Sequence, residues 1–401
     1  MLTSISDKAT GFEKRFENIE TEVFENSNSA SKAVAQEIAS LIIDKQARNQ
    51  LCVLGLATGS TPKGLYNELV RMHKEDGLSF KNVVSFNLDE YYPIEPDAVN
   101  SYVRFMKELL FDHVDIVPEN IHIPDGTLSK QKIADYCRDY ETKIEALGGI
   151  DIQILGIGGN GHIGFNESGS LQNSKTRLVA LDHITRVAAS KDFSGLTNTP
   201  RTAITLGIKK IMEAKRVVLM AWGEGKSNII KESTEGPVTN QVPASFLQEH
   251  NNVVFVIDKA AASKLKRINT PWLVEKIAWT DEMIRKAVLG LALHLKKPIL
   301  MLTDADYIEN GMSDLLADSG PAYDINIKIF NKVQHTITGW PGGKPNADDK
   351  DRPERSQPIK KRVLIFSPHP DDDIISMGGT LQMMRLYVMQ VLFVIIMRSL
   401  E

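Results

Sequence analysis

The chain has few cysteines, only Cys52 and Cys137 among its 401 residues. Both stand in apolar or helical-looking stretches, which argues against the disulfide framework of a small secreted protein. A reducing compartment suits two free thiols, so we expect a cytoplasmic protein. The N-terminal stretch is polar and mixed in charge, and it lacks the apolar segment of a secretory signal.

Long apolar runs and an excess of positive charge are also missing. The longest late apolar run, at 386–397, is shorter than the roughly 20 residues of a spanning helix, so we interpret it as a buried strand. The formal net charge is −4, which provides no basic field for nucleic acid. The sequence therefore predicts neither a membrane nor a nucleic-acid partner, and an anionic small molecule would need local positive charge.

Short apolar runs alternate with segments of helical periodicity along the first two thirds of the chain. The predicted strands are 51–57, 82–88, 151–157, 216–222 and 252–258. The predicted helices begin at Pro62 and near 101, 129 and 271. This alternation predicts an α/β fold with a doubly wound, mostly parallel sheet and helices on both faces.

A change in composition divides the chain. Residues 339–361 are dense in proline, glycine and charge, which predicts a linker. We therefore expect one large domain at 1–338, with 271–316 as its helical cap. A new strand begins at Arg362, so 362–401 is predicted to be the start of a truncated second α/β domain.

The stretch GIGGNGHIGFNE at 156–167 contains the spacing G-x-G-x-x-G, which is typical of dinucleotide-binding turns. Such a turn must be followed by a helix, but HIGFNESGSLQNSKT has no helical periodicity. The context therefore disfavours a dinucleotide cofactor. A loop at the carboxyl edge of the sheet that presents His162 and Glu167 is the better interpretation.

Three further predicted strands end in polar loops. Thr58, Gly59, Ser60 and Thr61 precede Pro62 at a predicted helix start, where hydroxyls and free N–H groups suit a phosphate. Asp89 and Glu90 follow the second strand, and Lys226 lies in GEGKS after the fourth. Each loop alone is ordinary, since capped turns, solvated acids and surface lysines are common. Four of them on one predicted sheet edge indicate a ligand site.

Several of these motifs occur together, in order. They are LATGSTPKGLY, FNLDEYYP, LGIGGNGHIGFNE, AITLGIKKIMEAKRVVLMAWGEGKS and TPWLV. The combination resembles the glucosamine-6-phosphate deaminase (NagB) family across nearly all of 30–300. The resemblance implies the NagB/ribose-5-phosphate isomerase/CoA-transferase-like fold, a homo-oligomer and a role in amino-sugar catabolism. It also implies conversion of glucosamine 6-phosphate and water to fructose 6-phosphate and ammonia, without a metal or organic cofactor.

The resemblance assigns roles to individual residues. His162 would open the sugar ring, and Glu167 would hold the imidazole of His162 in place. Asp89 would shuttle a proton between neighbouring carbons. Asn160 belongs to the same catalytic loop, where many members have aspartate. Residues 58–61 and Lys226 would bind the phosphate.

Two further positions depart from the family pattern. Lys191 stands where the second phosphate ligand is usually an arginine, so it keeps the charge but loses the bidentate fork. Ser168 replaces a frequent proline, which removes no chemical group.

Two alternatives stay open beside the deaminase. A 6-phosphogluconolactonase has the same fold and phosphate site but only hydrolyses an ester, so it would not need Asp89 for carbon-to-carbon proton transfer. A sugar-phosphate sensor would bind without turnover and would be marked by lost catalytic residues. The intact set of Asp89, His162 and Glu167 favours the deaminase.

The motif SPHPDDD at 367–373, followed by GGTLQ, resembles the start of the zinc-dependent PIG-L/LmbE-like deacetylases. That resemblance implies zinc ligation by His369 and Asp372 and a general base at Asp371. Asp373 stands where the family usually has glutamate. The site is incomplete, so zinc is expected only of a complete second domain.

Overall fold

The computed structural model describes residues 16–334, 362–367 and 390–395. The chain forms two compact units, Met1–Ile277 and Ala278–Glu401. Each unit is described by itself below.

The first unit is built on a seven-stranded sheet with the order β1-β10-β9-β6-β2-β3-β5, in which every neighbouring pair is parallel. The strands are β1 (Glu20–Phe24), β2 (Cys52–Leu56), β3 (Val83–Asn87), β5 (Ile121–His122), β6 (Ile152–Leu155), β9 (Val217–Ala221) and β10 (Val253–Asp258). The central strands are buried throughout, which explains their continuous apolar sequences. The predicted mostly parallel sheet is confirmed.

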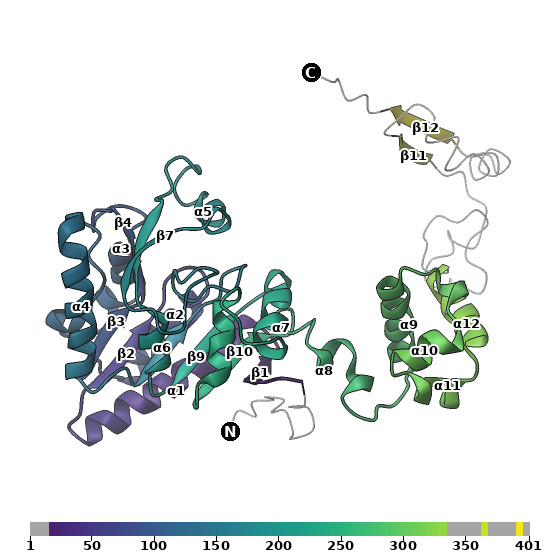
Figure 1. Cartoon of the computed structure of the whole chain (residues 1–401), viewed down its shortest axis with the longest axis horizontal. Helices are drawn as coiled ribbons and strands as arrows, with labels where there is room; N and C mark the ends of the chain where they lie inside the picture. Colours follow the sequence, from purple (N-terminus) through teal and green to yellow (C-terminus); the bar gives the residue numbers. More distant parts are fainter. Residues whose placement is uncertain (1–15, 335–361, 368–389, 396–401) are drawn as a thin grey trace. The chain divides into compact units, whose positions relative to one another are not determined.

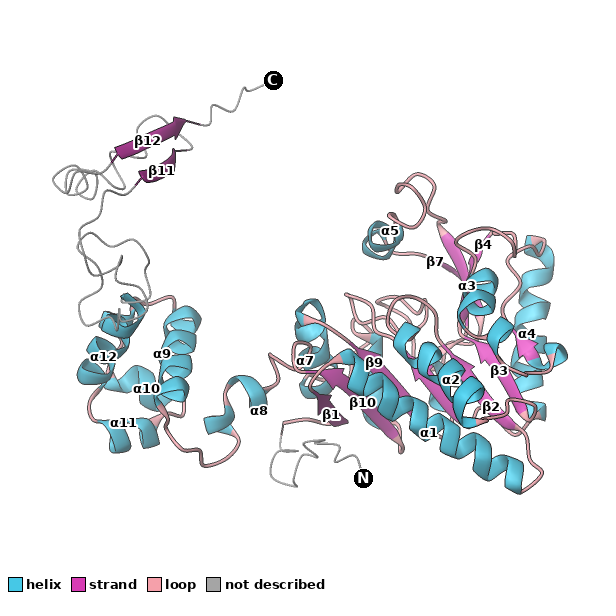
Figure 2. Cartoon of the chain, turned by 180° about the vertical axis from the view of Figure 1, so that it is seen from behind, coloured by secondary structure: helices cyan, strands magenta, loops and turns pink. Residues whose placement is uncertain are grey.

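Helices flank this sheet on both faces (Figures 1 and 2). Its main helices are α1 (Ser27–Ala47), α2 (Lys63–Asp76), α4 (Lys130–Ala146), α6 (Ile208–Met212) and α7 (Ser227–Glu235). The first two lie side by side on the face turned toward the viewer in Figure 2. Buried positions of α1 recur at helical spacing, at Val34, Ile38 and Ile42, so one apolar stripe packs on the sheet.

A second, antiparallel sheet lies beyond the end of β3, with the order β4-β8-β7. Its strands are β4 (Asp89–Tyr92), β7 (Arg177–Ala180) and β8 (Thr202–Thr205), and Asp89 is paired with Thr205. The sequence predicted only a single sheet, because short strands of mixed polarity have no clear period. This small sheet carries the segments that lead to α3 (Tyr102–Leu109) and α5 (His183–Ala189).

The topology explains why the polar loops meet. Strands β9, β6, β2 and β3 are consecutive neighbours and parallel, so their carboxyl ends lie at the same edge of the sheet. The loops that begin after Ala221, Leu155, Leu56 and Asn87 therefore leave from adjacent positions.

The second unit contains a cluster of helices with its own buried residues. These helices are α9 (Asp281–Leu295), α10 (Asp304–Glu309), α11 (Ser313–Ser319) and α12 (Ala322–Gln334). Tyr307 is fully buried and donates a hydrogen bond of 2.8 Å to Asn326. The expected helical character of 271–316 is present, but most of it groups with the second unit because its apolar residues pack on α12. The limits of the functional domains, including the one at 338, stay predictions.

Two strands follow, β11 (Arg362–Ser367) and β12 (Gln390–Ile395), and they pair in parallel. Both were predicted from apolar runs. The linker at 339–361 lies outside the described residues. Within the described part of the chain, no helix combines the length and apolar character needed to cross a membrane.

Candidate active site

A cavity of about 400 Å³ opens at the carboxyl edge of the large sheet. Residues of all four predicted loops line it, among them Thr58, Gly59, Ser60, Thr61, Asp89, Asn160, His162 and Lys226. The small sheet and its attached helices supply further walls, which include Tyr91, Tyr102 and Thr185, and the glycine loop adds Phe165. The convergence predicted from the strand ends is therefore found in the structure.

One part of the cavity is suited to an anion. Residues 58–61 connect β2 to the start of α2, so their hydroxyls and backbone N–H groups lie at a helix N-terminus. Lys226 faces the same cavity, and its Nζ donates a hydrogen bond of 2.7 Å to the carbonyl of Ile157. Burial lowers the pKa of Lys226. No carboxylate of the described residues forms an ion pair with Lys226, which leaves its charge available for a ligand.

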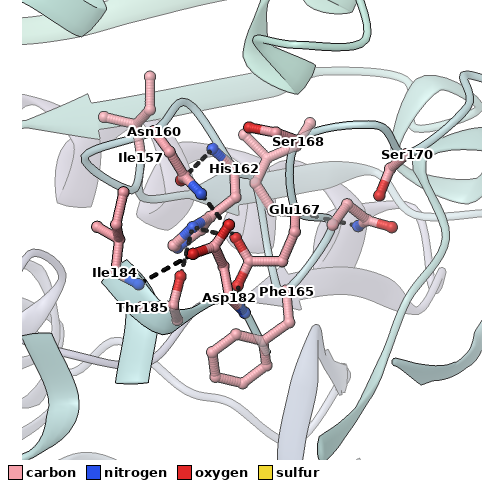
Figure 3. Close-up of polar contacts among 12 residues, drawn as sticks. Ile157, Asn160, His162, Phe165, Glu167, Ser168, Ser170, Asp182, Ile184 and Thr185 are labelled. Atoms are coloured by element: carbon pink, nitrogen blue, oxygen red, sulfur yellow. Dashed lines mark hydrogen bonds and ion pairs between the residues drawn. The ribbon is translucent and has the colours of Figure 1, made fainter. Parts of the chain in front are cut away.

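The glycine loop places His162 at the cavity and pairs it with Glu167 behind it (Figure 3). Nδ1 of His162 lies 3.2 Å from Oε2 of Glu167, and Nδ2 of Asn160 donates to the same oxygen at 2.8 Å. The backbone N–H of Asp182 donates to Oε1 of Glu167 at 3.2 Å. Burial acts to raise the pKa of Glu167, but hydrogen bonds from His162, Asn160 and Thr185 outweigh it and lower the pKa to about 2.

The glycines of this loop make room for His162. Gly158 donates its N–H to the carbonyl of His162 at 3.0 Å, which closes the turn. A Cβ at Gly158 would lie 2.2 Å from the imidazole ring, so only glycine leaves room for His162. Gly161 has a φ of 84°, a conformation that other residues rarely adopt. The loop thus presents His162 at the cavity, and the absence of a dinucleotide cofactor stays a prediction.

Asp89 begins β4 and is only 6% exposed. Burial raises the pKa of Asp89 to about 8, and the neighbouring negative charge of Glu90 adds to the effect. Its Oδ2 faces Gly164, where a Cβ would approach to 3.3 Å. A carboxyl group that titrates near neutrality can both accept and return a proton, which is what a proton shuttle requires.

Gly164→Ala should lower both turnover and thermal stability. Gly164 has a φ of 56°, and an added Cβ would lie 2.9 Å from Oγ1 of Thr205 as well as close to Asp89. The strained backbone and the contact should together cost about 1–3 kcal/mol. Thermal unfolding and ammonia release measure the two effects. Gly290→Ala in α9 is the matched control, since nothing lies within 4 Å of its added Cβ and Gly290 does not line the cavity. Equal behaviour of the two variants would contradict this interpretation.

The two positions that depart from the family pattern, Lys191 and Ser168, do not line the cavity. Lys191 is exposed and does not line the cavity. Ser168 is also exposed, and its hydroxyl donates to the carbonyl of Gln241 at 2.9 Å, so this position anchors the loop. His369 and Asp372 lie outside the described residues, and among the described residues no cluster of His, Cys, Asp and Glu could hold a metal.

Sequence reasoning missed the aromatic and hydroxyl wall of the cavity. Tyr102 is the first residue of α3 and stacks on Phe165, with ring centres 6.1 Å apart. Thr185 comes from α5, and its Oγ1 lies 3.4 Å from Nδ1 of His162. The capping serine before Tyr102 marks the helix start, but no local pattern shows that this helix points at the cavity.

The chain is similar to known proteins over the region that contains this site. Residues 25–256 match the family described as glucosamine-6-phosphate isomerases/6-phosphogluconolactonase, and the chain belongs to this family. A glucosamine-6-phosphate deaminase of Halothermothrix orenii is 48% identical over 241 residues, which are 60% of this chain and 98% of that protein. A solved monomeric glucosamine-6-phosphate deaminase of the NagB superfamily is 39% identical, with a TM-score of 0.58, and the match covers 61% of this chain and 98% of that one.

Two other matches are a relative that is longer than this chain and a solved structure of low sequence identity. A glucosamine-6-phosphate deaminase-like protein of Bacteroides thetaiotaomicron is 55% identical over 368 residues, which are 92% of this chain. The chain spans only 56% of that longer relative. The 6-phosphogluconolactonase of Trypanosoma brucei is 21% identical with a TM-score of 0.50, and it shares the fold.

Proposed function

We propose that the chain converts glucosamine 6-phosphate and water to fructose 6-phosphate and ammonia. The observation that carries this proposal is that one cavity brings together a buried carboxyl group, a histidine that is paired with Glu167, and a lysine that forms no ion pair with the described residues. The related deaminases are similar over the part of the chain that builds this cavity. The buried carboxyl group of Asp89 corresponds to the base of this reaction, and His162 corresponds to the ring-opening group. Lys226 corresponds to the group that binds the phosphate.

The chemistry follows from the position of each group. Lys226 and residues 58–61 bind the phosphate and so orient the sugar in the cavity. His162, oriented by Glu167, transfers the proton that opens the pyranose ring. Asp89 then takes the proton from C2 while the aldehyde oxygen on C1 gains a proton from the substrate's ammonium group, which gives an enolamine. Asp89 returns its proton to C1, which leaves a C2=N iminium. Water adds to C2 and ammonia leaves, which gives the ketone.

The decisive experiment measures ammonia and fructose 6-phosphate after the purified chain is mixed with glucosamine 6-phosphate. We expect both products in equal amounts, with and without a chelator, because the proposed steps use only side chains of this chain. Hydrolysis of 6-phosphogluconolactone without ammonia release would identify a lactonase instead. Tight binding of the sugar phosphate without turnover would identify a sensor.

The assembly state is a separate part of the proposal. We infer a homo-oligomer in the cytoplasm, and analytical ultracentrifugation of the purified chain tests the first point. The related solved deaminase is described as monomeric, so a single species with the mass of one chain, 44.6 kDa, is the contrary outcome.

The region from Arg362 onward carries a further proposal, a PIG-L/LmbE-like deacetylase segment with His369 and Asp372 as zinc ligands. Its support is the sequence motif SPHPDDD at 367–373 alone. A catalytic zinc usually keeps three protein ligands, and no histidine follows His369 in this sequence. We therefore expect no acetate release from N-acetylglucosamine derivatives by this chain loaded with zinc. Release that His369→Ala abolishes would contradict this expectation.

A further inference from the structure

The buried acid beside Asp89 has no role in the steps above. Glu90 is only 1% exposed, and it adjoins Asp89 on β4. An ionised carboxylate is costly to bury unless it is compensated. The contacts of Glu90 therefore decide what this side chain does.

Glu90 accepts hydrogen bonds from three backbone N–H groups. Tyr91 donates to Oε1 at 2.9 Å, Tyr102 donates to Oε2 at 2.8 Å, and Val103 donates to Oε2 at 3.1 Å. Two of these donors are the first residues of α3, whose N–H groups have no partner within the helix. Burial raises the pKa of Glu90 to about 7, and these three hydrogen bonds oppose that rise because they favour the ionised form.

The surroundings of Asp89 are different. No hydrogen bond to its carboxylate is found among the described residues, and no described cation forms an ion pair with it. The ionisable groups near it are phenols, together with the cavity groups His162 and Lys226 and the adjacent Glu90. The phenols that interact with Asp89 belong to Tyr66, Tyr91, Tyr102 and Tyr140. Of the two adjacent acids, the backbone thus stabilises the charge of Glu90 and leaves that of Asp89 uncompensated.

We propose that Glu90 is a positioning residue for Asp89. The first N–H groups of α3 hold the Glu90 carboxylate, and its negative charge beside Asp89 makes the Asp89 carboxylate a stronger base. The same contacts hold Tyr102 at the cavity wall, where its hydroxyl is hydrogen-bonded to Thr58 of the predicted phosphate loop. One buried carboxylate thus links the base to the loop that binds the phosphate. This inference rests on the proposed deamination, in which Asp89 is the base.

The test is a direct titration of Asp89 by carbon-13 NMR of the full chain labelled at aspartate carboxyl groups, with Asp89→Asn to assign the signal. In Glu90→Gln the titration midpoint of Asp89 should fall by about one pH unit or more, because a like charge next to it is removed. Glu95→Gln is the matched control, since it removes an exposed charge nearby and should leave the midpoint unchanged. An unchanged Asp89 midpoint in folded Glu90→Gln would overturn the proposal.

A reciprocal measurement covers the case in which Glu90→Gln does not fold. Coupling between two sites is mutual, so Asp89→Asn should lower the midpoint of Glu90 by the same amount, measured on a chain labelled at glutamate carboxyl groups. An unchanged Glu90 midpoint there would equally overturn the proposal. In active enzyme, the acid limb of the pH profile of kcat should move to lower pH in Glu90→Gln. A purely structural role of Glu90 would not cause this shift. Because the NMR titration needs no turnover, absent ammonia release would refute the proposed function alone.

Discussion

Asp89→Asn is expected to reduce ammonia release by about 10²–10⁴-fold while binding of glucosamine 6-phosphate is retained. The amide has nearly the shape of the carboxylate but cannot accept the C2 proton. The measurements are kcat from ammonia release and Kd from calorimetry. Near-normal kcat in this variant would show that another group is the base.

Asp89→Asn should also increase the free energy of unfolding, because the pKa of Asp89 is raised in the folded protein. Burial raises the pKa of Asp89 to about 8 in the folded protein, whereas in the unfolded chain the pKa is the ordinary aspartate value of 3.8. The folded state therefore binds more protons between these values, so the wild type loses stability as pH rises through this window. Asparagine carries no such charge. The free energy of unfolding of Asp89→Asn should exceed that of the wild type increasingly up to pH 8.

Urea unfolding of both proteins at several pH values from 5 to 9 measures this difference. A constant difference across the range would mean that the ionisation of Asp89 does not differ between the folded and unfolded states. A variant that is inactive and more stable at pH 8 would indicate that burial of this charge serves catalysis at a cost in stability.

Lys226→Ala is expected to weaken binding of glucosamine 6-phosphate by about tenfold to hundredfold, because hydrogen bonds to charged groups contribute about 1.5–3 kcal/mol. Binding of unphosphorylated glucosamine should change little. The reason is that the Nζ of Lys226 faces the cavity and forms no ion pair with the described residues. Calorimetry with the two sugars measures the difference.

Lys191→Ala provides the comparison for Lys226. Lys191 is exposed and lies outside the cavity lining, so its removal should have a smaller effect on the phosphorylated sugar. Equal losses for both sugars in Lys226→Ala would show that this lysine supports the loop through Ile157 instead. A larger loss in Lys191→Ala than in Lys226→Ala would restore the role that the family resemblance assigned to Lys191.

The parallel sheet and the principal polar groups could be predicted without coordinates. Buried central strands require continuous apolar runs, and these runs identified β2, β3, β6, β9 and β10. Once those strands are parallel neighbours, the residues that follow them must meet at one edge. Asp89, His162 and Lys226 were found for this reason, and the missing helix after Gly161 argued against a dinucleotide site.

The burial of the site residues and their long-range contacts depend on tertiary packing, because the segments that meet are far apart in the chain. The pairing of Asp89 with Thr205 in the small sheet buries the carboxyl group and raises its pKa, and no local pattern encodes that pairing. The start of α3 meets Glu90, and Thr185 of α5 meets His162, across 12 and 23 residues of sequence. Residue types and strand order thus follow from local periodicity, whereas the protonation and orientation of the site follow from contacts that only the folded chain creates.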